Sequence, residues 1–288
     1  MNPGPVTADL RKSAAGAAAA GLAEDAATAD VTTGSLGASA DVRGTLLAVA
    51  KKPCTVCGWF AVEEVYTVLG GAETVQEVPD GCFAGPGQVI GRVSGAALTL
   101  LRGERVALNL LARLSGIATM TSRFVEAVSG TGVEILDTRK TTPGFRAMER
   151  YAVRCGGGAN HRFDLSSMAL FKDNHIALAG GMRFLAGPVT RARKLGVAIE
   201  IEVENAAQLA EALELGPERV LLDNMPPGEV RMAASICRSR GVYCEASGGV
   251  NLENVRAYAE AGVSGISTGA LTHSAPAADI SFELEVPR

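Results

Sequence analysis

The sequence has few aromatic residues and no long apolar run, and each scarcity excludes a class of protein. Aromatic residues make up 5% of the 288 residues, which disfavours the base-stacking surfaces of proteins that bind single-stranded nucleic acid. Charged residues interrupt every apolar stretch before the roughly 18 residues that a membrane-spanning helix needs. The Ala-rich start carries Asp9, Glu24, Asp25 and Asp30, which do not suit a secretory signal. We therefore expect a soluble, cytoplasmic protein.

Cysteines are also few, and their spacing does not form a disulfide framework. The six are scattered along the chain, so we expect reduced thiols. Cys54 and Cys57 form a lone Cys-x-x-Cys pair, a spacing that occurs in zinc and redox sites. Because no second Cys or His pair at matching spacing accompanies it, we favour a turn that carries two free thiols.

Charge is nearly balanced overall but unevenly distributed. The 27 Lys and Arg residues against 31 Asp and Glu residues give a net charge of −4, which disfavours a protein that coats nucleic acid. Between positions 139 and 172 the balance reverses. The basic residues there are Arg139, Lys140, Arg146, Arg150, Arg154, Arg162 and Lys172, against Glu149 and Asp164. This island indicates a small anionic ligand, although the i, i+4 spacing of the middle three arginines also suits a solvated helix face.

Hydrophobic periodicity divides the chain near residue 115. The first part reads as a mixed α/β domain with short strands at 89–93 and 97–101, followed by a helical pattern from Glu104. After residue 130, strand, turn and helix repeat. The strand candidates are 133–137, 168–172, 197–203, 220–223, 242–246 and 264–268.

The spacing of these later strands predicts a parallel barrel. Their end residues Glu202, Asp223, Glu245 and Thr268 are 21, 22 and 23 positions apart, the length of one strand plus one crossover helix. Such a barrel carries its chemistry at the carboxyl ends of its strands, often with a phosphate site after the last two.

Polar and glycine residues gather at those strand ends. Ser247-Gly248-Gly249 and Thr268-Gly269-Ala270 expose backbone N–H groups that suit a phosphate. Glu202 and Asp223 end consecutive strands, where a hydrated Mg²⁺ or sugar hydroxyls are the expected partners and a rim salt bridge is the alternative. Strand alternation also places Glu200 and Glu204 on the side of Glu202, so the choice among the three stays open.

Five cationic side chains complete this predicted mouth. They are Arg139, Lys140, His161, Arg162 and Lys172. Arginine grips a planar carboxylate through two parallel hydrogen bonds, whereas lysine acts as a point charge. Five such groups exceed what one phosphate needs. We therefore expect a ligand with two carboxylates, or with a carboxylate and a pyrophosphate.

Several motifs together resemble the quinolinate phosphoribosyltransferase family. They include Leu136-Asp137-Thr138-Arg139-Lys140-Thr141, Asn160-His161-Arg162 and Lys172-Asp173-Asn174-His175, and the similarity extends over nearly the whole chain. The resemblance implies an α/β fold in which an incomplete parallel α/β barrel (116–272) follows an N-terminal α/β sandwich domain (1–115), with a C-terminal segment (273–288) returning to the sandwich. It also implies a homodimer or higher homo-oligomer, with no nucleic-acid or membrane partner.

The resemblance further implies the reaction and the residue roles. Phosphoribosyl passes from phosphoribosyl pyrophosphate to quinolinate with loss of CO₂, in the presence of Mg²⁺, during NAD biosynthesis. Lys140, Glu202 and Asp223 match catalytic positions, and the two acids would hold Mg²⁺ indirectly, through water or phosphate. The matched substrate-binding set is Thr138, Arg139, Lys140, His161, Arg162, Lys172, Ser247, Gly248, Gly249, Thr268, Gly269 and Ala270, with Arg105 supplied by the neighbouring subunit.

Three places depart from the family pattern: the cysteine-bearing segment 54–58, the segment 163–171 and Thr268. None is a matched cation, so the departures bear on specificity. The alternatives are transfer to a related pyridine such as nicotinate without CO₂ loss, and a non-catalytic anion-binding or assembly protein of the same fold.

Overall fold

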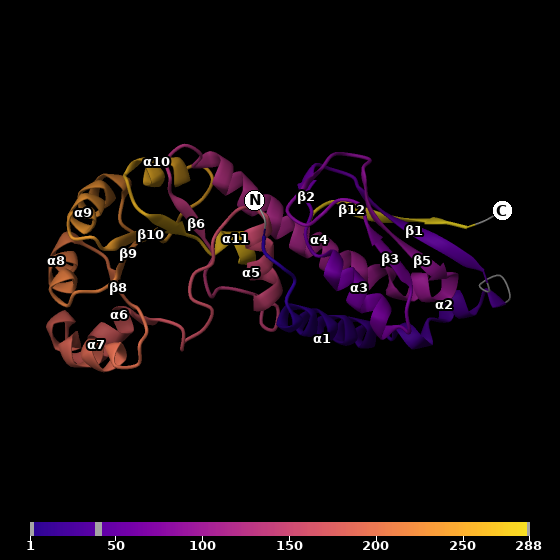
Figure 1. The fold of residues 1–288 in the computed structure, drawn as a ribbon, viewed down its shortest axis with the longest axis horizontal. Coiled ribbons are helices and arrows are strands. Elements are labelled where there is room, and N and C mark those ends of the chain that lie inside the picture. Colours follow the sequence, from indigo (N-terminus) through magenta and orange to yellow (C-terminus); the bar gives the residue numbers. More distant parts are fainter. Residues whose placement is uncertain (1–2, 38–41, 287–288) are drawn as a thin grey trace. The chain divides into compact units, whose positions relative to one another are not determined.

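The computed structural model describes residues 3–37 and 42–286, and the chain separates into two compact units (Figure 1). The first is built from the chain up to Ser122, from Thr141–Gly157 and from Leu271 onward. The second comprises Arg123–Lys140 and Gly158–Ala270. The domain limits that the sequence predicts, at residues 115 and 272, stay a prediction.

The first unit is organised around an antiparallel sheet of order β12-β1-β5-β3. Its strands are β1 (Arg43–Ala50), β3 (Glu73–Gln76), β5 (Val89–Ala96) and β12 (Ile280–Glu285), beside a ribbon of β2 (Cys54–Thr55) and β4 (Phe83–Ala84). Its helices are α1 (Ala8–Glu24), η1 (Ala27–Ala29), α2 (Val31–Gly34), α3 (Trp59–Val68), α5 (Arg146–Cys155) and most of α4 (Ala97–Ala127) and α11 (Ala270–His273). The last strand pairs with β1, so distant ends of the sequence share one sheet.

Local sequence explains how α1 forms and packs. Thr7 caps its N-terminus, because the Thr7 hydroxyl accepts a hydrogen bond from the Leu10 backbone N–H. Leu10, Ala14, Ala18 and Leu22 then recur every four residues and are all buried. The small alanines allow close approach, and α1 packs against α3 (Figure 1).

The predicted strand at 97–101 is wrong, because these residues form the first turns of α4, which begins at Ala97 and not at Glu104. A short apolar run does not distinguish a buried strand from a buried helix. Here the run continues into a helical pattern, and Leu100 is fully buried.

Glu149 connects the three chain segments of the first unit. Its side chain is completely buried and lies 2.8 Å from Arg113 Nη2. It also accepts hydrogen bonds from the backbone and hydroxyl of Thr142. Arg113 in turn donates to the carbonyls of Thr272 and Ala275. A charged pair with these additional hydrogen bonds offsets the cost of burial and orders the segments together.

The second unit contains a six-stranded sheet of order β6-β11-β10-β9-β8-β7, parallel throughout. Its strands are β6 (Glu134–Leu136), β7 (Ala169–Phe171), β8 (Ile199–Val203), β9 (Arg219–Asp223), β10 (Tyr243–Ser247) and β11 (Gly265–Ser267). All six strands are confirmed, with bounds within two residues of the prediction. Among the described residues β6 and β7 stand at the two ends of this order and do not pair with each other.

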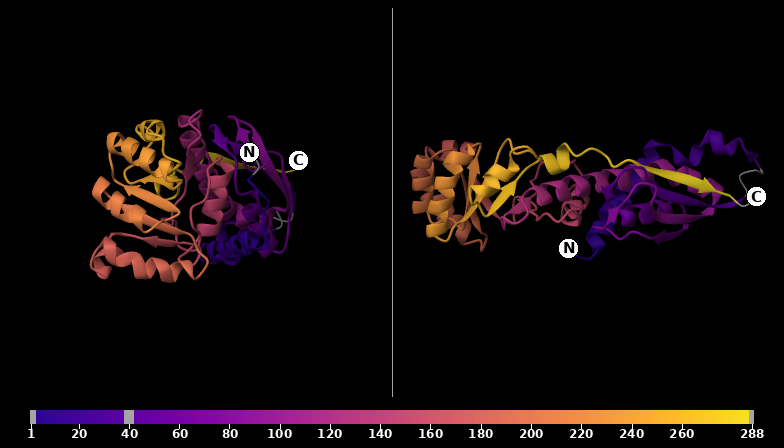
Figure 2. Two further views of the ribbon diagram at one scale, coloured as in Figure 1. Left: turned by 60° about the vertical axis from the view of Figure 1, so that its left-hand side comes forward. Right: turned by 90° about the horizontal axis from the view of Figure 1, so that it is seen from above.

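Helices on one side of this sheet cover the strands that they connect (Figure 2). They are α7 (Ala186–Arg193), α8 (Ala206–Glu214), α9 (Pro227–Ser239) and α10 (Val255–Glu260). α6 (Asp173–Ala179) and η3 (Met182–Leu185) precede α7 and contact each other. In β8, the fully buried Ile199, Ile201 and Val203 alternate with Glu200 and Glu202. One face of the strand therefore packs against helices, and the other presents carboxylates.

None of the helices in the described part of the chain is long and apolar enough to cross a membrane.

Gly91 provides a stability test of the first unit, because its missing side chain leaves room for the Trp59 ring. A Cβ added at Gly91 would lie 2.4 Å from that ring. We expect Gly91→Ala to lower the free energy of unfolding by about 1–3 kcal/mol, the usual cost of overpacking a core. Gly16→Ala is the control: it lies in α1 with open space around it and should stabilise by roughly 0.5–1 kcal/mol. Urea unfolding measures both, and equal stabilities would contradict this account.

Candidate active site

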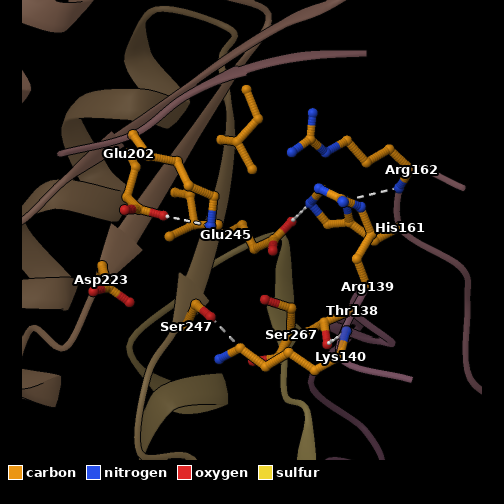
Figure 3. A pocket seen from close by; sticks show the side chains of 13 residues that line it. Thr138, Arg139, Lys140, His161, Arg162, Glu202, Asp223, Glu245, Ser247 and Ser267 are labelled. Carbon is orange, nitrogen blue, oxygen red and sulfur yellow. Dashed lines mark hydrogen bonds and ion pairs between the residues drawn. The ribbon is translucent and has the colours of Figure 1, made fainter. Parts of the chain in front are cut away.

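A cavity of about 130 Å³ lies within the second unit at the carboxyl ends of its strands (Figure 3). Most of its lining residues carry polar side chains, and they come from the six strands, the residues that follow them and the segment 161–162 before β7. The lining residues are Thr138, Arg139, Lys140, His161, Arg162, Leu170, Lys172, Glu202, Leu221, Asp223, Glu245, Ser247 and Ser267. Every predicted catalytic residue, and every predicted cation except Arg105, lies here.

The other predicted residues do not line this cavity. Gly248 and Gly249 follow β10 with positive φ angles of 88° and 60°, which favour glycine. Thr268 is buried; its hydroxyl donates to the Val250 carbonyl and accepts from the Ala270 N–H. Gly269 and Ala270 follow β11 and lead into α11. Arg105 is an exposed residue of α4 in the first unit.

Asp137 holds two of the motifs together. It is completely buried at the end of β6 and accepts hydrogen bonds from the Asn160 side chain at 2.6 Å and from the His161 backbone N–H at 2.8 Å. The Thr138 hydroxyl accepts from the Lys140 N–H at 3.0 Å. These contacts fix the segment carrying Arg139 and Lys140 relative to the segment carrying His161 and Arg162.

Two fully buried carboxylates, Glu200 and Glu245, lie beneath His161. Nε2 of His161 is 3.0 Å from Glu200 and 3.3 Å from Glu245. Both carboxylates also pair with Arg219, at 3.1 Å and 2.6 Å. Burial alone would lower the pKa of His161, but hydrogen bonds and charge from the two glutamates outweigh it and raise this pKa to about 9.

The ring of His161 carries a proton on Nε2 in either of its charge states. The backbone N–H of Arg162 lies 2.7 Å from Nδ1 and donates to it, which in the neutral ring leaves Nε2 protonated. Full protonation of the ring, which the carboxylates favour, keeps Nε2–H and adds a proton on Nδ1, so that the Arg162 N–H no longer donates to it. The Nε2 proton therefore faces Glu200 and Glu245.

Charges at the mouth are arranged in two groups, with cations on one side and carboxylates on the other. Burial and the charge of Arg139 lower the pKa of Arg162. Burial raises the pKa of Glu202, and the charges of Asp223 and Asp173 add to the rise, while Lys172 at 3.4 Å opposes it. Crowded cations on one side favour an anionic ligand, and crowded carboxylates on the other favour a cation or hydroxyls.

The structure separates the three glutamates of β8 and its end. Glu200 is buried with Arg219, Glu202 lines the cavity, and Glu204 is exposed. Sequence reasoning missed the site roles of Arg219, Glu245 and Ser267. Strand alternation from Ser247 back to Glu245 was the available signal for Glu245, because both residues face the same side of β10.

Fold and cavity together define the class: an α/β protein whose cavity, at the carboxyl ends of a parallel sheet, has the charged lining that suits an anionic small molecule. Two family models match the chain, described as the N-terminal domain of quinolinate phosphoribosyl transferase over residues 30–115 and its C-terminal domain over residues 117–283. The chain belongs to the quinolinate phosphoribosyl transferase family.

Individual relatives agree with the family models. A probable nicotinate-nucleotide pyrophosphorylase [carboxylating] of Bacillus subtilis is 41% identical, over 91% of this chain and 90% of its own length. The Homo sapiens nicotinate-nucleotide pyrophosphorylase [carboxylating] is 38% identical, over 82% and 80%. The solved structure of the nicotinate-nucleotide pyrophosphorylase from Francisella tularensis superposes with a TM-score of 0.88 at 34% identity, covering 96% of this chain and 97% of that one. The predicted α/β fold class and family are confirmed.

Cys54 and Cys57 lie in the first unit and carry free, buried thiols. Cys57 is in addition close to two residues from distant parts of the sequence: its sulfur, the Asp80 carboxylate and the Cys155 sulfur lie within 4.8 Å of one another. Burial raises the pKa of the Cys57 thiol well above its ordinary value, so the thiol is protonated at neutral pH.

The raised pKa of His161 predicts a loss of stability with rising pH. Protonation of a group whose pKa is higher in the folded than in the unfolded state stabilises fully below the unfolded value, near 6.5, and this contribution disappears as pH rises through about 9. We expect the free energy of unfolding to fall across this window by up to about 3 kcal/mol. Urea unfolding at several pH values measures it. His161→Asn should flatten the slope, and a slope equal to that of the wild type would contradict this account.

Proposed function

We propose that this protein transfers phosphoribosyl from phosphoribosyl pyrophosphate to quinolinate with decarboxylation, giving nicotinate mononucleotide, pyrophosphate and CO₂ in NAD biosynthesis in the cytoplasm. The observation that carries the proposal is the crowding of Arg139, Arg162 and Lys172 around one small cavity, as the site of a dicarboxylate requires. The activity for which the relatives are named supports the same assignment.

Quinolinate would lie against the cationic side of the cavity. Arg139 and Arg162 suit its two carboxylates, because each guanidinium offers paired N–H donors, and Lys172 adds a point charge. Arg162 is itself oriented, since its Nη1 donates to the Met168 carbonyl at 2.9 Å. Fixing both carboxylates holds the ring nitrogen in one direction, which reduces the entropy lost on reaching the transition state.

Phosphoribosyl pyrophosphate would occupy the opposite side. Ser247 with the glycines that follow β10 would supply hydroxyl and backbone donors for phosphate. The segment 268–270 after β11, whose shape the hydrogen bonds of Thr268 fix, would lie beside the phosphate. Thr138 and Lys140 follow β6 and line the cavity. Lys140 adds a positive charge for the phosphoribosyl group.

Glu202 and Asp223 fit a divalent cation. Both line the cavity, and the charge of Asp223 is among the causes that raise the pKa of Glu202, a repulsion that a cation would relieve. Carboxylate oxygens and water are the ligands that Mg²⁺ prefers. Bound Mg²⁺ would supply positive charge against the departing pyrophosphate.

The side chains of the protein then stabilise the charge that develops on the ribose and position the quinolinate ring nitrogen. As the bond from ribose C1 to pyrophosphate breaks, positive charge develops on the ribose, and the carboxylates of Glu202 and Asp223 stabilise it. The quinolinate ring nitrogen, held by the cations, forms the new bond to C1. CO₂ leaves from the neighbouring ring carbon, whose electron pair is stabilised by the positive nitrogen and then takes up a proton.

Arg162 provides the direct test of the quinolinate site. We expect Arg162→Ala to raise the KM for quinolinate roughly 10- to 100-fold, from the loss of about 1.5–3 kcal/mol for a hydrogen bond between charged groups. The KM for phosphoribosyl pyrophosphate should change little. Arg231→Ala, an exposed arginine of α9, is the control. Initial rates followed by absorbance together with CO₂ release decide the matter.

The same assay separates the rival activities. If nicotinate is turned over as fast as quinolinate and no CO₂ is released, the base substrate is a related pyridine and not quinolinate. Calorimetry that finds quinolinate binding without turnover would assign a non-catalytic anion-binding protein.

Arg105 is proposed to reach the cavity of a neighbouring subunit in a homodimer or larger assembly. Arg105→Ala and Lys172→Ala should each be nearly inactive alone. Mixing the two variants under conditions of subunit exchange should restore activity, because a mixed dimer contains one cavity with both residues intact. If activity does not recover although mass measurements show that the subunits have exchanged, Arg105 does not act in the neighbouring subunit's site.

A further inference from the structure

We propose that Arg219 is a positioning residue that keeps the floor of the dicarboxylate site electrically neutral and thereby sets the affinity for the dianionic substrate. This inference rests on the proposed function. It concerns a residue at the start of β9 that does not line the cavity.

The floor of the site, formed by Glu200 and Glu245 beneath His161, contains two buried negative charges. Glu200 and Glu245 are both completely buried, and buried carboxylates are costly unless paired. They also lie on the substrate side of the sheet, where Glu245 lines the cavity. Left uncompensated, they would repel a ligand with two negative charges.

Arg219 compensates both carboxylates from one side. Its Nε is 3.1 Å from Glu200 and its Nη2 is 2.6 Å from Glu245. β9 lies between β8 and β10 in the sheet, so a single guanidinium fork spans the two neighbouring strands. Lysine has no such fork.

The Arg219 guanidinium is held in place by the ring of Tyr243, on the side away from the cavity. It stacks on the Tyr243 ring, with Cζ 3.9 Å from the ring centroid. The Tyr243 hydroxyl donates to Glu134 at 2.8 Å. Gly265 leaves space for this hydroxyl, since a Cβ there would lie 2.2 Å from it. Residues at the starts of three other strands, β6, β10 and β11, thus fix the orientation of the Arg219 side chain.

His161 completes the charge balance from the cavity side. Its Nε2 proton faces the two carboxylates, and its Nδ1 accepts from the Arg162 N–H. Both ring nitrogens are therefore engaged by the protein. In this neutral state of the ring, the series Arg219, glutamates, His161 and Arg162 connects the floor to a proposed quinolinate-binding cation. When Nδ1 also takes up a proton, the Arg162 N–H no longer donates to it, and two cations then meet two carboxylates.

The inference is tested by removing the charge of Arg219 and then removing one of the two negative charges that it balances. Arg219→Gln leaves an extra negative charge in the floor. We expect it to raise the KM for quinolinate about tenfold or more while the KM for phosphoribosyl pyrophosphate changes less than about twofold, because the dicarboxylate is proposed to lie nearer to this charge. Arg219→Gln with Glu245→Gln restores neutrality and should recover most of the quinolinate affinity. Arg231→Gln, exposed on α9, controls for loss of an arginine elsewhere in the unit.

The outcomes are distinct. A wild-type protein inactive on quinolinate would reject the proposed function, whatever Arg219 does. An active wild type with an unchanged quinolinate KM in folded Arg219→Gln would overturn the inference, and so would equal rises in both KM values or failure of the double variant to recover. If Arg219→Gln does not fold, the folded double variant still decides: a quinolinate KM near that of the wild type supports the inference, and a tenfold higher one refutes it.

Discussion

Compensation of buried charge is the constraint on which the second unit depends. The parallel sheet encloses Glu200 and Glu245 between strands whose other faces are packed with aliphatic side chains, and neither carboxylate has access to water. Arg219 and His161 supply the opposite charge from two directions. Because the desolvation cost of a lone buried carboxylate amounts to several kcal/mol, the partners are part of the fold as well as of the site. This explains why the cavity floor is polar without being open to solvent.

Much of this arrangement follows from sequence patterns that have a physical cause. Parallel strands separated by one crossover helix recur at nearly constant spacing, and all six strands of the second unit were predicted from that spacing and from apolar runs. Their carboxyl ends meet at one edge, so Arg139, Lys172, Glu202 and Asp223 were expected to lie together, and they line one cavity. The family resemblance added the substrate and the residue roles.

Other features depend on three-dimensional context that periodicity does not contain. The run at 97–101 is apolar in a way that suits either strand or helix, and only its packing as part of α4 decides between them. Arg219 is an ordinary basic residue in the sequence, and its importance comes from the two neighbouring strands across which it reaches. Cys155 meets Cys57 and Asp80 only because the fold brings three distant segments together.

The C-terminal strand has a consequence for how the chain matures. β12 occupies the edge of the first unit's sheet beside β1, and the carbonyls of Thr272 and Ala275 accept hydrogen bonds from Arg113, the partner of buried Glu149. The first unit, whose chain emerges first from the ribosome, therefore completes its sheet last. Until translation has passed β12, β1 has an unpaired edge, and a nascent chain at that stage would be a natural client for a chaperone that shields exposed strands.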